Sequence, residues 1–181
     1  MRRGIEEAPD FITVDSSDGG TGAAPMTFID DVGMRIYESL PIVVDKLIVY
    51  GLRQRIRLIA SGKMINPSEV AAGLCMGADF VVSARGFMFA LGCIQALQCN
   101  KDTCPTGITT HNKRLQKGLV PENKAARVEN YVRHMVREVV MLANSCGLVS
   151  PRELSRRHLR VVGDDGSSHG FDKLHPLPKA G

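Results

Sequence analysis

Three cysteines lie close together in the middle of the chain and carry its clearest potential for chemistry. Cys93, Cys99 and Cys104 fall within twelve residues, in the segment GCIQALQCNKDTCPTG. A structural zinc site fits this spacing poorly, because there is no Cys-x-x-Cys pair and no histidine placed to complete four ligands. A three-thiolate iron–sulfur site fits better, and Pro105 follows the last cysteine as in one ferredoxin pattern.

A purely structural role for these cysteines is the alternative. Free cysteine is commonly a small buried hydrophobic residue, and we interpret Cys75 and Cys146, which lie in the runs GLCMGA and ANSCGL, in this way. Cys99 and Cys104 differ because they bracket the polar run 100–103, which is typical of a loop. The residues alone favour metal ligation and leave the structural alternative open.

The elements that must position these cysteines alternate between strands and helices. Short runs rich in valine and isoleucine predict strands at 11–15, 56–60 and 80–83. Helices are predicted at 27–51 with an interruption near Pro41, at 68–76, at 87–98 and at 121–144. Such alternation indicates a parallel sheet covered on both faces.

Local signals define the ends of several predicted helices. Asn66 can cap the helix that begins after it, Pro67 can occupy the first helical position, and Gly77 can end that helix. The apolar helix 87–98 delivers the first two cysteines to the triplet. The last helix is amphipathic and ends at Gly147, and its apolar residues recur at helical spacing: Val128, Val132, Met135 or Val136, Val139 and Leu142.

The length limits the fold that these elements can build. With 181 residues, the chain is too short for a complete eight-stranded α/β barrel, which typically needs about 250 residues. Three βα units make a fraction of such a barrel. We therefore expect an α/β fold that forms a portion, about three βα units, of a (β/α)8 TIM barrel, with appended helices, over residues 1–162. The tail 163–181, rich in glycine, serine, proline and charge, is expected to be disordered.

Small residues follow every predicted strand at its carboxyl end, the face on which α/β barrels build their sites. Exposed N–H groups at a helix N-terminus attract phosphate, and small residues let it come close. The second and third loops are predicted to clasp one phosphate group, through Ser61, Gly62, Lys63, Ala84, Arg85 and Gly86. The alternative is that both are ordinary connections between a strand and a helix.

The first loop is denser in glycine than a simple connection requires. It departs from the G-x-G-x-x-G fingerprint and lacks the lysine of a P-loop, so neither an NAD-type nor an ATP-type site is indicated. A close approach of the backbone to a flat ligand is the interpretation we favour, and a mobile surface loop is the alternative. The residues concerned are Asp18, Gly19, Gly20, Thr21 and Gly22.

Composition argues against several other classes of protein. The longest apolar run, Leu40–Tyr50, is too short and too interrupted to span a membrane. An odd number of cysteines without a secretory start indicates a reducing, cytoplasmic location. The net charge is +4, and the excess lies in residues 111–160, where Tyr131 is the one aromatic residue, so nucleic-acid binding is not expected. A solvated helix face, or a docking surface for an acidic electron carrier, is expected instead.

The series DSSDGGTGAAP, RIRLIASGK, GADFVVSARG and GCIQALQCNKDTCPTGI resembles the flavin-binding synthase domain of glutamate synthases. The resemblance runs from about residue 11 to 162 and covers only the C-terminal part of that domain. It implies that the strands are the last three of a (β/α)8 barrel with FMN at its carboxyl end. It also implies that Cys93, Cys99 and Cys104 hold a 3Fe-4S cluster.

The resemblance further implies roles for the loops and for partners. Residues 61–63 and 84–86 match the phosphate-side loops around FMN, and residues 18–22 lie beside the flavin and the substrate. In this family, 2-oxoglutarate and ammonia give 2-iminoglutarate, which is reduced to glutamate with electrons that the cluster relays. Ferredoxin or an NADPH-oxidising subunit supplies those electrons, and a glutaminase-type subunit can supply ammonia. The catalytic residues are expected upstream of this chain.

Departures from the family pattern leave other functions open. Lys63 and Arg85 stand where the large-subunit enzymes have other residues, which suggests a shorter, stand-alone branch of the family. Neither a glutaminase region nor the five preceding βα units are found, so activity of these 181 residues alone is not expected. One alternative is an FMN enzyme acting on another amine, similar to N-methylglutamate synthase. The other is an inactive fragment that binds a cluster or packs on another subunit.

Overall fold

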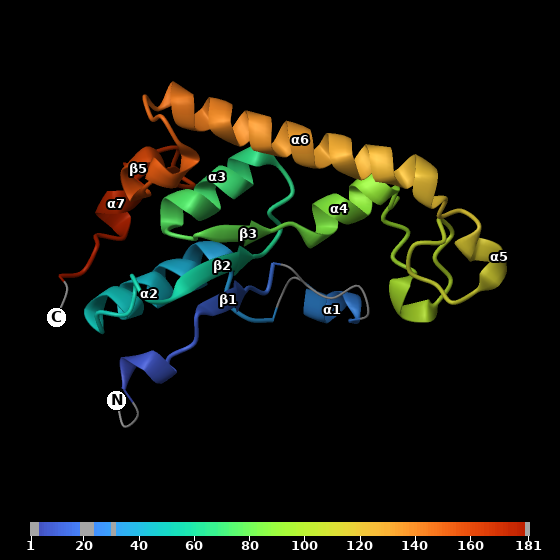
Figure 1. Cartoon of the computed structure of the whole chain (residues 1–181), viewed down its shortest axis with the longest axis horizontal. Helices are drawn as coiled ribbons and strands as arrows, with labels where there is room; N and C mark the ends of the chain where they lie inside the picture. The colour runs from blue at the N-terminus through green and yellow to red at the C-terminus, as the bar shows by residue number, and fades with distance from the viewer. Residues whose placement is uncertain (1–3, 19–23, 30–31, 180–181) are drawn as a thin grey trace.

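A three-stranded parallel sheet forms the centre of the computed structural model, which describes residues 4–18, 24–29 and 32–179 (Figure 1). Strands β1 (Phe11–Asp15), β2 (Arg57–Ser61) and β3 (Phe80–Val82) lie in the order β1-β2-β3. Their register aligns Asp15 with Ser61 and Ser61 with Val82. The three strands therefore end at one edge of the sheet, called here the carboxyl edge. The predicted parallel α/β arrangement is confirmed.

Helices and short 3-10 turns connect and follow these strands. The longer helices are α2 (Ile36–Val49), α3 (Pro67–Met76), α4 (Ala84–Leu91) and α6 (Pro121–Ser145). Shorter helices are η1 (Ile5–Glu7), α1 (Met26–Ile29), η2 (Cys99–Lys101), α5 (Lys113–Gln116), η3 (Pro151–Glu153), η4 (Arg156–His158) and α7 (Phe171–Leu174). A two-stranded antiparallel sheet pairs β4 (Arg160–Val162) with β5 (Ser168–Gly170). Among the described residues, no helix is both long and apolar enough to cross a membrane.

One face of the parallel sheet packs against helices and the other is bare within the described residues. Val14, Leu58 and Ala60 are buried and share a core cluster with the apolar face of α2. On the opposite face, Phe11 and Phe80 are 60% and 50% exposed. The expected cover on both faces is therefore wrong for the described part of the chain. The bare face carries large apolar side chains, which normally lie in a core.

Helix α2 is continuous, although a break was expected near Pro41. A proline inside a helix removes one backbone hydrogen bond. Here Ile36, Leu40, Pro41, Val44 and Leu47 are all buried along the helix. Burial of this apolar stripe outweighs the lost hydrogen bond, so the predicted break is wrong. The helix begins at Ile36, and α1 forms a separate short helix before it.

Helices α3 and α6 follow their sequence signals closely. The side chain of Asn66 accepts a hydrogen bond from Glu69 N–H and that of Glu69 accepts one from Asn66 N–H, which is a capping box. Gly77 ends α3 in the left-handed conformation at φ +112°. Helix α6 continues one residue beyond its predicted end and stops before Gly147, whose φ is +77°. Both predicted helices are confirmed.

The helix predicted at 87–98 is displaced toward the sheet. Helix α4 begins directly after β3 and ends at Gly92, which adopts φ +104°. Gln95 and Leu97 also have positive φ values, of 54° each, which a right-handed helix cannot accommodate. Cys93 therefore follows the helix, and Cys99 lies in the separate turn η2. The expectation that one helix carries both cysteines is wrong.

The C-terminal segment differs from the expected disorder. Its strands β4 and β5 pair, and Phe171 in α7 is only 1% exposed within the main core. The Phe171 ring also stacks on His175, with the ring centroids 4.4 Å apart. One large aromatic residue thus supplies the buried apolar area that the rest of this polar segment lacks.

A buried arginine joins the C-terminal segment to α2. Arg156 is 4% exposed and donates to the Asp45 carboxylate at 2.6 Å and to the His175 carbonyl at 2.8 Å. It also donates to the Pro41 carbonyl, at 3.4 Å. A buried charge is stable only when it is paired and hydrogen-bonded, so this network fixes the segment in place.

Replacing Phe171 by alanine is expected to destabilise the chain by about 3–5 kcal/mol, because truncation of a buried aromatic side chain leaves a cavity. Urea unfolding of the two chains measures the difference. Leu177→Ala is the matched control, since Leu177 is 61% exposed, and its effect should stay within about 0.5 kcal/mol. Equal effects of the two substitutions would show that the C-terminal segment does not pack on the core.

Candidate functional site

The carboxyl edge brings together the three loops that the sequence singles out. Ser16 N–H donates to the Ser61 carbonyl at 2.9 Å, which holds the loop after β1 against the end of β2. The register places Val82, and thus the start of the 84–86 segment, beside Ser61. Two of the predicted site segments, 61–63 and 84–86, therefore lie at neighbouring positions along this edge.

The loop after β2 packs closely on the loop after β1. A Cβ atom added at Gly62 would collide with the Ser16 hydroxyl and would lie 3.3 Å from Ile36 Cβ. Only glycine leaves room for this approach. The hydroxyls of Ser16 and Ser17 are buried and have no hydrogen-bond partner in the described part of the chain. Because buried polar groups are normally paired, these two hydroxyls mark a place where a polar ligand would complete the site.

Asp18 is the one residue of the predicted 18–22 segment that the structure describes. Its carboxylate accepts a hydrogen bond from Ile36 N–H at 2.9 Å, at the start of α2. A carboxylate at this position satisfies a backbone donor and interacts favourably with the helix dipole. Gly19, Gly20, Thr21 and Gly22 lie outside the described residues. The expectation that this loop lies beside a flat ligand therefore stays a prediction.

Helix α4 presents its N-terminus at the carboxyl edge, and Ser83 occupies the N-cap position. Serine at this position usually caps its helix through its side chain. Here the Ser83 side chain makes no capping hydrogen bond, and its hydroxyl lies 2.8 Å from the Tyr131 hydroxyl instead. Ala84, Arg85 and Gly86 form the first turn of α4. This first turn is the part of the helix to which an anion binds.

Tyr131 is a site residue that the sequence analysis did not identify. Its hydroxyl donates to the Ile65 carbonyl at 2.7 Å and contacts Ser83, so it links the loops after β2 and β3. A Cβ atom at Gly86 would collide with the same hydroxyl. One sequence signal could have identified Tyr131, which lies three residues after Val128 on the apolar stripe of α6. A tyrosine hydroxyl on such a face needs hydrogen-bond partners from neighbouring elements.

The second group of predicted site residues lies in the cysteine loop, residues 92–112, beyond the far end of α4 (Figure 1). Cys93 and Cys99 are half-buried, and Cys104 is 8% exposed. No three or more histidine, cysteine or acidic side chains converge on a single metal ion among the residues that the structure describes. In an iron–sulfur cluster the three thiolates would bind different iron atoms, so this finding concerns a single-ion site and does not test a cluster.

Cys104 lies in surroundings that stabilise a thiolate. Burial raises the pKa of this thiol, but hydrogen bonds from Thr106 and Thr109 outweigh burial and lower the pKa to about 6. The Thr106 hydroxyl lies 3.2 Å from the sulfur. The buried Thr109 hydroxyl makes no hydrogen bond of ordinary geometry with any residue that the structure describes, so Thr106 is the better-supported donor. A sulfur atom that is already ionised near neutral pH is prepared to bind metal.

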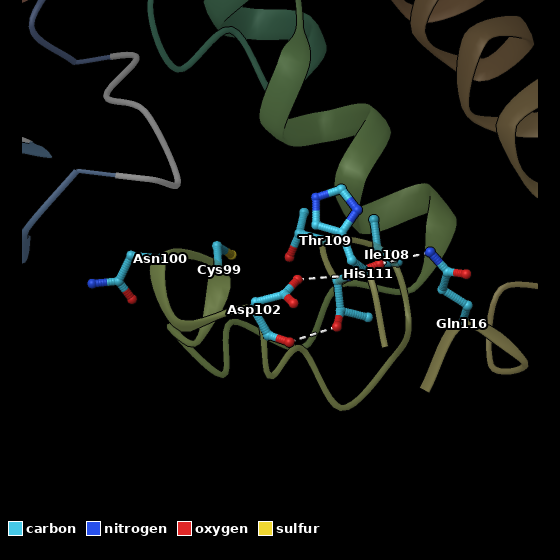
Figure 2. Close-up of a pocket in the computed structure, with 8 residues that line it drawn as sticks. Cys99, Asn100, Asp102, Ile108, Thr109, His111 and Gln116 are labelled. Carbon is cyan, nitrogen blue, oxygen red and sulfur yellow. Dashed lines mark hydrogen bonds between the residues drawn. The ribbon is translucent and has the colours of Figure 1, made fainter. Parts of the chain in front are cut away.

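An open pocket of about 490 Å³ adjoins Cys99 (Figure 2). Asp102 shapes its wall, because its carboxylate accepts from His111 N–H at 2.6 Å and its carbonyl accepts from the Thr110 hydroxyl at 2.5 Å. Asp102 adopts the left-handed conformation at φ +59°. The remaining lining comes from Asn100, Ile108, Thr109 and Gln116. This loop thus has a defined structure of its own around the cysteines.

Helix α6 contacts both parts of the site. It packs along α3 and α4, as Figure 1 shows. At its N-terminal end, Lys124 Nζ and Arg127 Nη1 would lie 3.0 and 3.4 Å from a Cβ atom at Gly92, the residue before Cys93. Seven residues after Lys124, Tyr131 reaches the carboxyl edge. The cysteine loop and the loops after β2 and β3 are therefore contacted by one helix.

A parallel sheet whose strands alternate with helices defines a protein of the α/β class. A family model described as "Conserved region in glutamate synthase" matches residues 3–149. The chain therefore belongs to the glutamate synthase family.

Individual relatives agree with this membership. The chain is 46% identical to the glutamate synthase large subunit-like protein YerD of Bacillus subtilis over 166 residues, which cover 92% of this chain and 32% of that protein. It is 37% identical to an archaeal glutamate synthase [NADPH] of Methanocaldococcus jannaschii, over 85% of this chain and 31% of the relative. The chain thus spans about a third of the length of these relatives.

The stability of the metal-free chain is expected to depend on the ionisation of Cys104. Its pKa of about 6 in the folded chain lies below the value of roughly 8.5 for an unfolded cysteine. At pH values between these two pKa values, the unfolded chain binds more protons than the folded chain. The resulting stabilisation is fully present above about pH 8.5 and is lost as the pH falls through about 6.

Urea unfolding across this pH range, compared with Cys104→Ser, isolates the contribution. The difference between the two chains should grow as the pH rises from about 6 to 8.5. A parallel pH dependence in both chains would contradict the assignment of a lowered pKa to Cys104.

Proposed function

We propose that this chain is the FMN- and cluster-binding portion of an oxidoreductase that forms glutamate from 2-oxoglutarate and ammonia. The observation that supports the proposal is that the 61–63 and 84–86 loops are neighbours at the carboxyl edge, with the cysteine loop at the other end of α4 and α6 against both. Membership of the glutamate synthase family supports the same reaction. The parallel strands and the bare apolar sheet face support a partial (β/α)8 barrel.

The carboxyl edge has the chemistry to hold the FMN phosphate. Gly62 and Gly86 keep the two loops compact, and the first turn of α4 offers backbone N–H groups to an anion. The hydroxyls of Ser16 and Ser17, which are buried and have no hydrogen-bond partner among the described residues, are further donors or acceptors for a polar ligand. Lys63 and Arg85 add positive charge to the same two loops. Ser61 and Ala84 complete the predicted set.

The cysteine loop has the chemistry to hold a 3Fe-4S cluster. Cys104 is buried and its pKa is lowered to about 6, which favours the thiolate form that binds metal. Cys99 lines the adjoining pocket, and Cys93 lies at the end of α4. Cys93, Cys99 and Cys104 would each supply one thiolate. Lys124 and Arg127, next to the residue before Cys93, would offset the negative charge of the cluster.

Within this function, FMN would supply hydride to 2-iminoglutarate and the cluster would relay electrons one at a time. The chain's own residues bind and orient these groups. An electron donor, either ferredoxin or an NADPH-oxidising subunit, and an ammonia-supplying subunit would act with it. The substrate would lie beside residues 18–22, and the remaining catalytic residues would come from the part of the protein that this chain does not cover.

Flavin binding tests the proposal first. FMN is titrated into two preparations. The first is the chain alone, and the second, called the completed chain, is the chain co-expressed with the part of the Bacillus subtilis relative that it does not match. Quenching of flavin fluorescence should report saturable binding, with FMN bound more tightly than riboflavin because the loops hold the phosphate. Absence of FMN binding in both preparations would refute the proposal.

Cluster assembly is a separate test. Anaerobic reconstitution is expected to incorporate iron and sulfide in the ratio of a 3Fe-4S cluster and to give the corresponding ferric EPR signal. Cys99→Ser should abolish both, whereas Cys146→Ser, at an exposed cysteine outside the loop, should leave both intact. Uptake of zinc without iron would exclude the electron-relay role.

A further inference from the structure

We infer that Tyr131 is a positioning residue that gives the carboxyl edge its preference for a flavin bearing a phosphate. The inference rests on the proposed function and concerns the two loops that would hold that phosphate. Tyr131 acts through Ile65, in the loop after β2, and through Ser83, which follows β3. Its hydroxyl forms a hydrogen bond with each of them.

The direction of these hydrogen bonds follows from counting protons. The Ile65 carbonyl can only accept, so the single proton of the Tyr131 hydroxyl is donated to it across 2.7 Å. The Ser83 hydroxyl, 2.8 Å away, must then donate its own proton to the tyrosine oxygen. The Ser83 side chain is thereby held toward α6.

This arrangement keeps Ser83 from capping α4. A serine at the N-cap ordinarily accepts a hydrogen bond from the second or third N–H of its helix, which here belong to the first turn at 84–86. Ser83 makes no such bond within the described structure. An anion that binds this turn competes with a capping side chain for the same donors. The Ser83 oxygen lies close to this turn, 2.6 Å from the position of a Cβ atom at Gly86, but it is engaged with Tyr131. Tyr131 thereby leaves the turn uncapped by Ser83, so that phosphate need not compete with that side chain.

The same hydroxyl fixes the spacing of the two loops. It ties Ile65, which follows the 61–63 loop, to Ser83, which precedes the 84–86 turn. Gly86 must lack a side chain because the hydroxyl occupies the position of its Cβ atom. The Tyr131 ring rests edge-on against Phe87, with the centroids 5.4 Å apart, so the phenol cannot easily tilt away.

The test compares FMN and riboflavin, which differ only in the phosphate, in the preparation that binds FMN. Tyr131→Phe keeps the ring and its contact with Phe87 and removes only the hydroxyl. We expect the FMN dissociation constant to rise about tenfold, the size of effect that loss of one hydrogen bond produces. The riboflavin constant should stay unchanged. Tyr50→Phe, at a residue 67% exposed on the far end of α2, should leave both constants unchanged.

The double substitution Tyr131→Phe/Ser83→Ala separates positioning from general destabilisation. With the tyrosine hydroxyl gone, Ser83 is free to cap α4, and removing its hydroxyl should restore part of the lost FMN affinity. Thermal unfolding of each variant checks that it is folded.

The outcomes are distinguishable. If the parent protein binds FMN no better than riboflavin, the phosphate site itself is refuted. If the parent prefers FMN but Tyr131→Phe weakens both flavins equally, or neither, Tyr131 is a structural residue and the inference is overturned. If the double variant binds FMN no better than the single one, the role assigned to Ser83 is wrong.

Discussion

The hydrogen bonds of the half-buried Tyr131 hydroxyl connect three parts of this molecule: α6, the loop after β2 and the loop after β3. Leaving such a hydroxyl without partners costs about 1–3 kcal/mol, so Tyr131 must be placed where both Ile65 and Ser83 can reach it. These bonds act together with the packing of α6 on α3 and α4 to hold α6 against the carboxyl edge. Because α6 also contacts the end of α4 next to Cys93, the same helix links the two candidate cofactor sites.

Local sequence signals account for much of the fold. The caps of α3 lie within the helix or next to it, and the three parallel strands follow from short apolar runs. The errors arose where distant residues decide. The buried stripe of α2 overrides Pro41, and Phe171 orders a polar tail through contacts with a core built far away in the chain. Helix α4 ends early because Gly92, Gln95 and Leu97 adopt positive φ values. Of these three residues, only the glycine is of a type that predicts such a conformation from the sequence.

The candidate site was predictable in its chemistry and not in its geometry. Cysteine spacing and glycine-rich loops are local patterns, and both were visible in the sequence. Tyr131 was not visible as a site residue, because its partners Ser83 and Ile65 lie 48 and 66 residues earlier in the chain. Thr106 was likewise overlooked, although it lies only two residues from Cys104, since a hydroxyl near a thiol is too common to be a signal.

The central claim is that the loops after β2 and β3 together bind the phosphate of FMN. A crystal structure of the completed chain with FMN tests it most directly. We predict that the phosphate lies within hydrogen-bonding distance of backbone N–H groups in both the 61–63 loop and the first turn of α4, with the Tyr131 hydroxyl still bound to Ser83. A phosphate held by other loops, or a Ser83 hydroxyl capping α4 beside the bound flavin, would contradict this account.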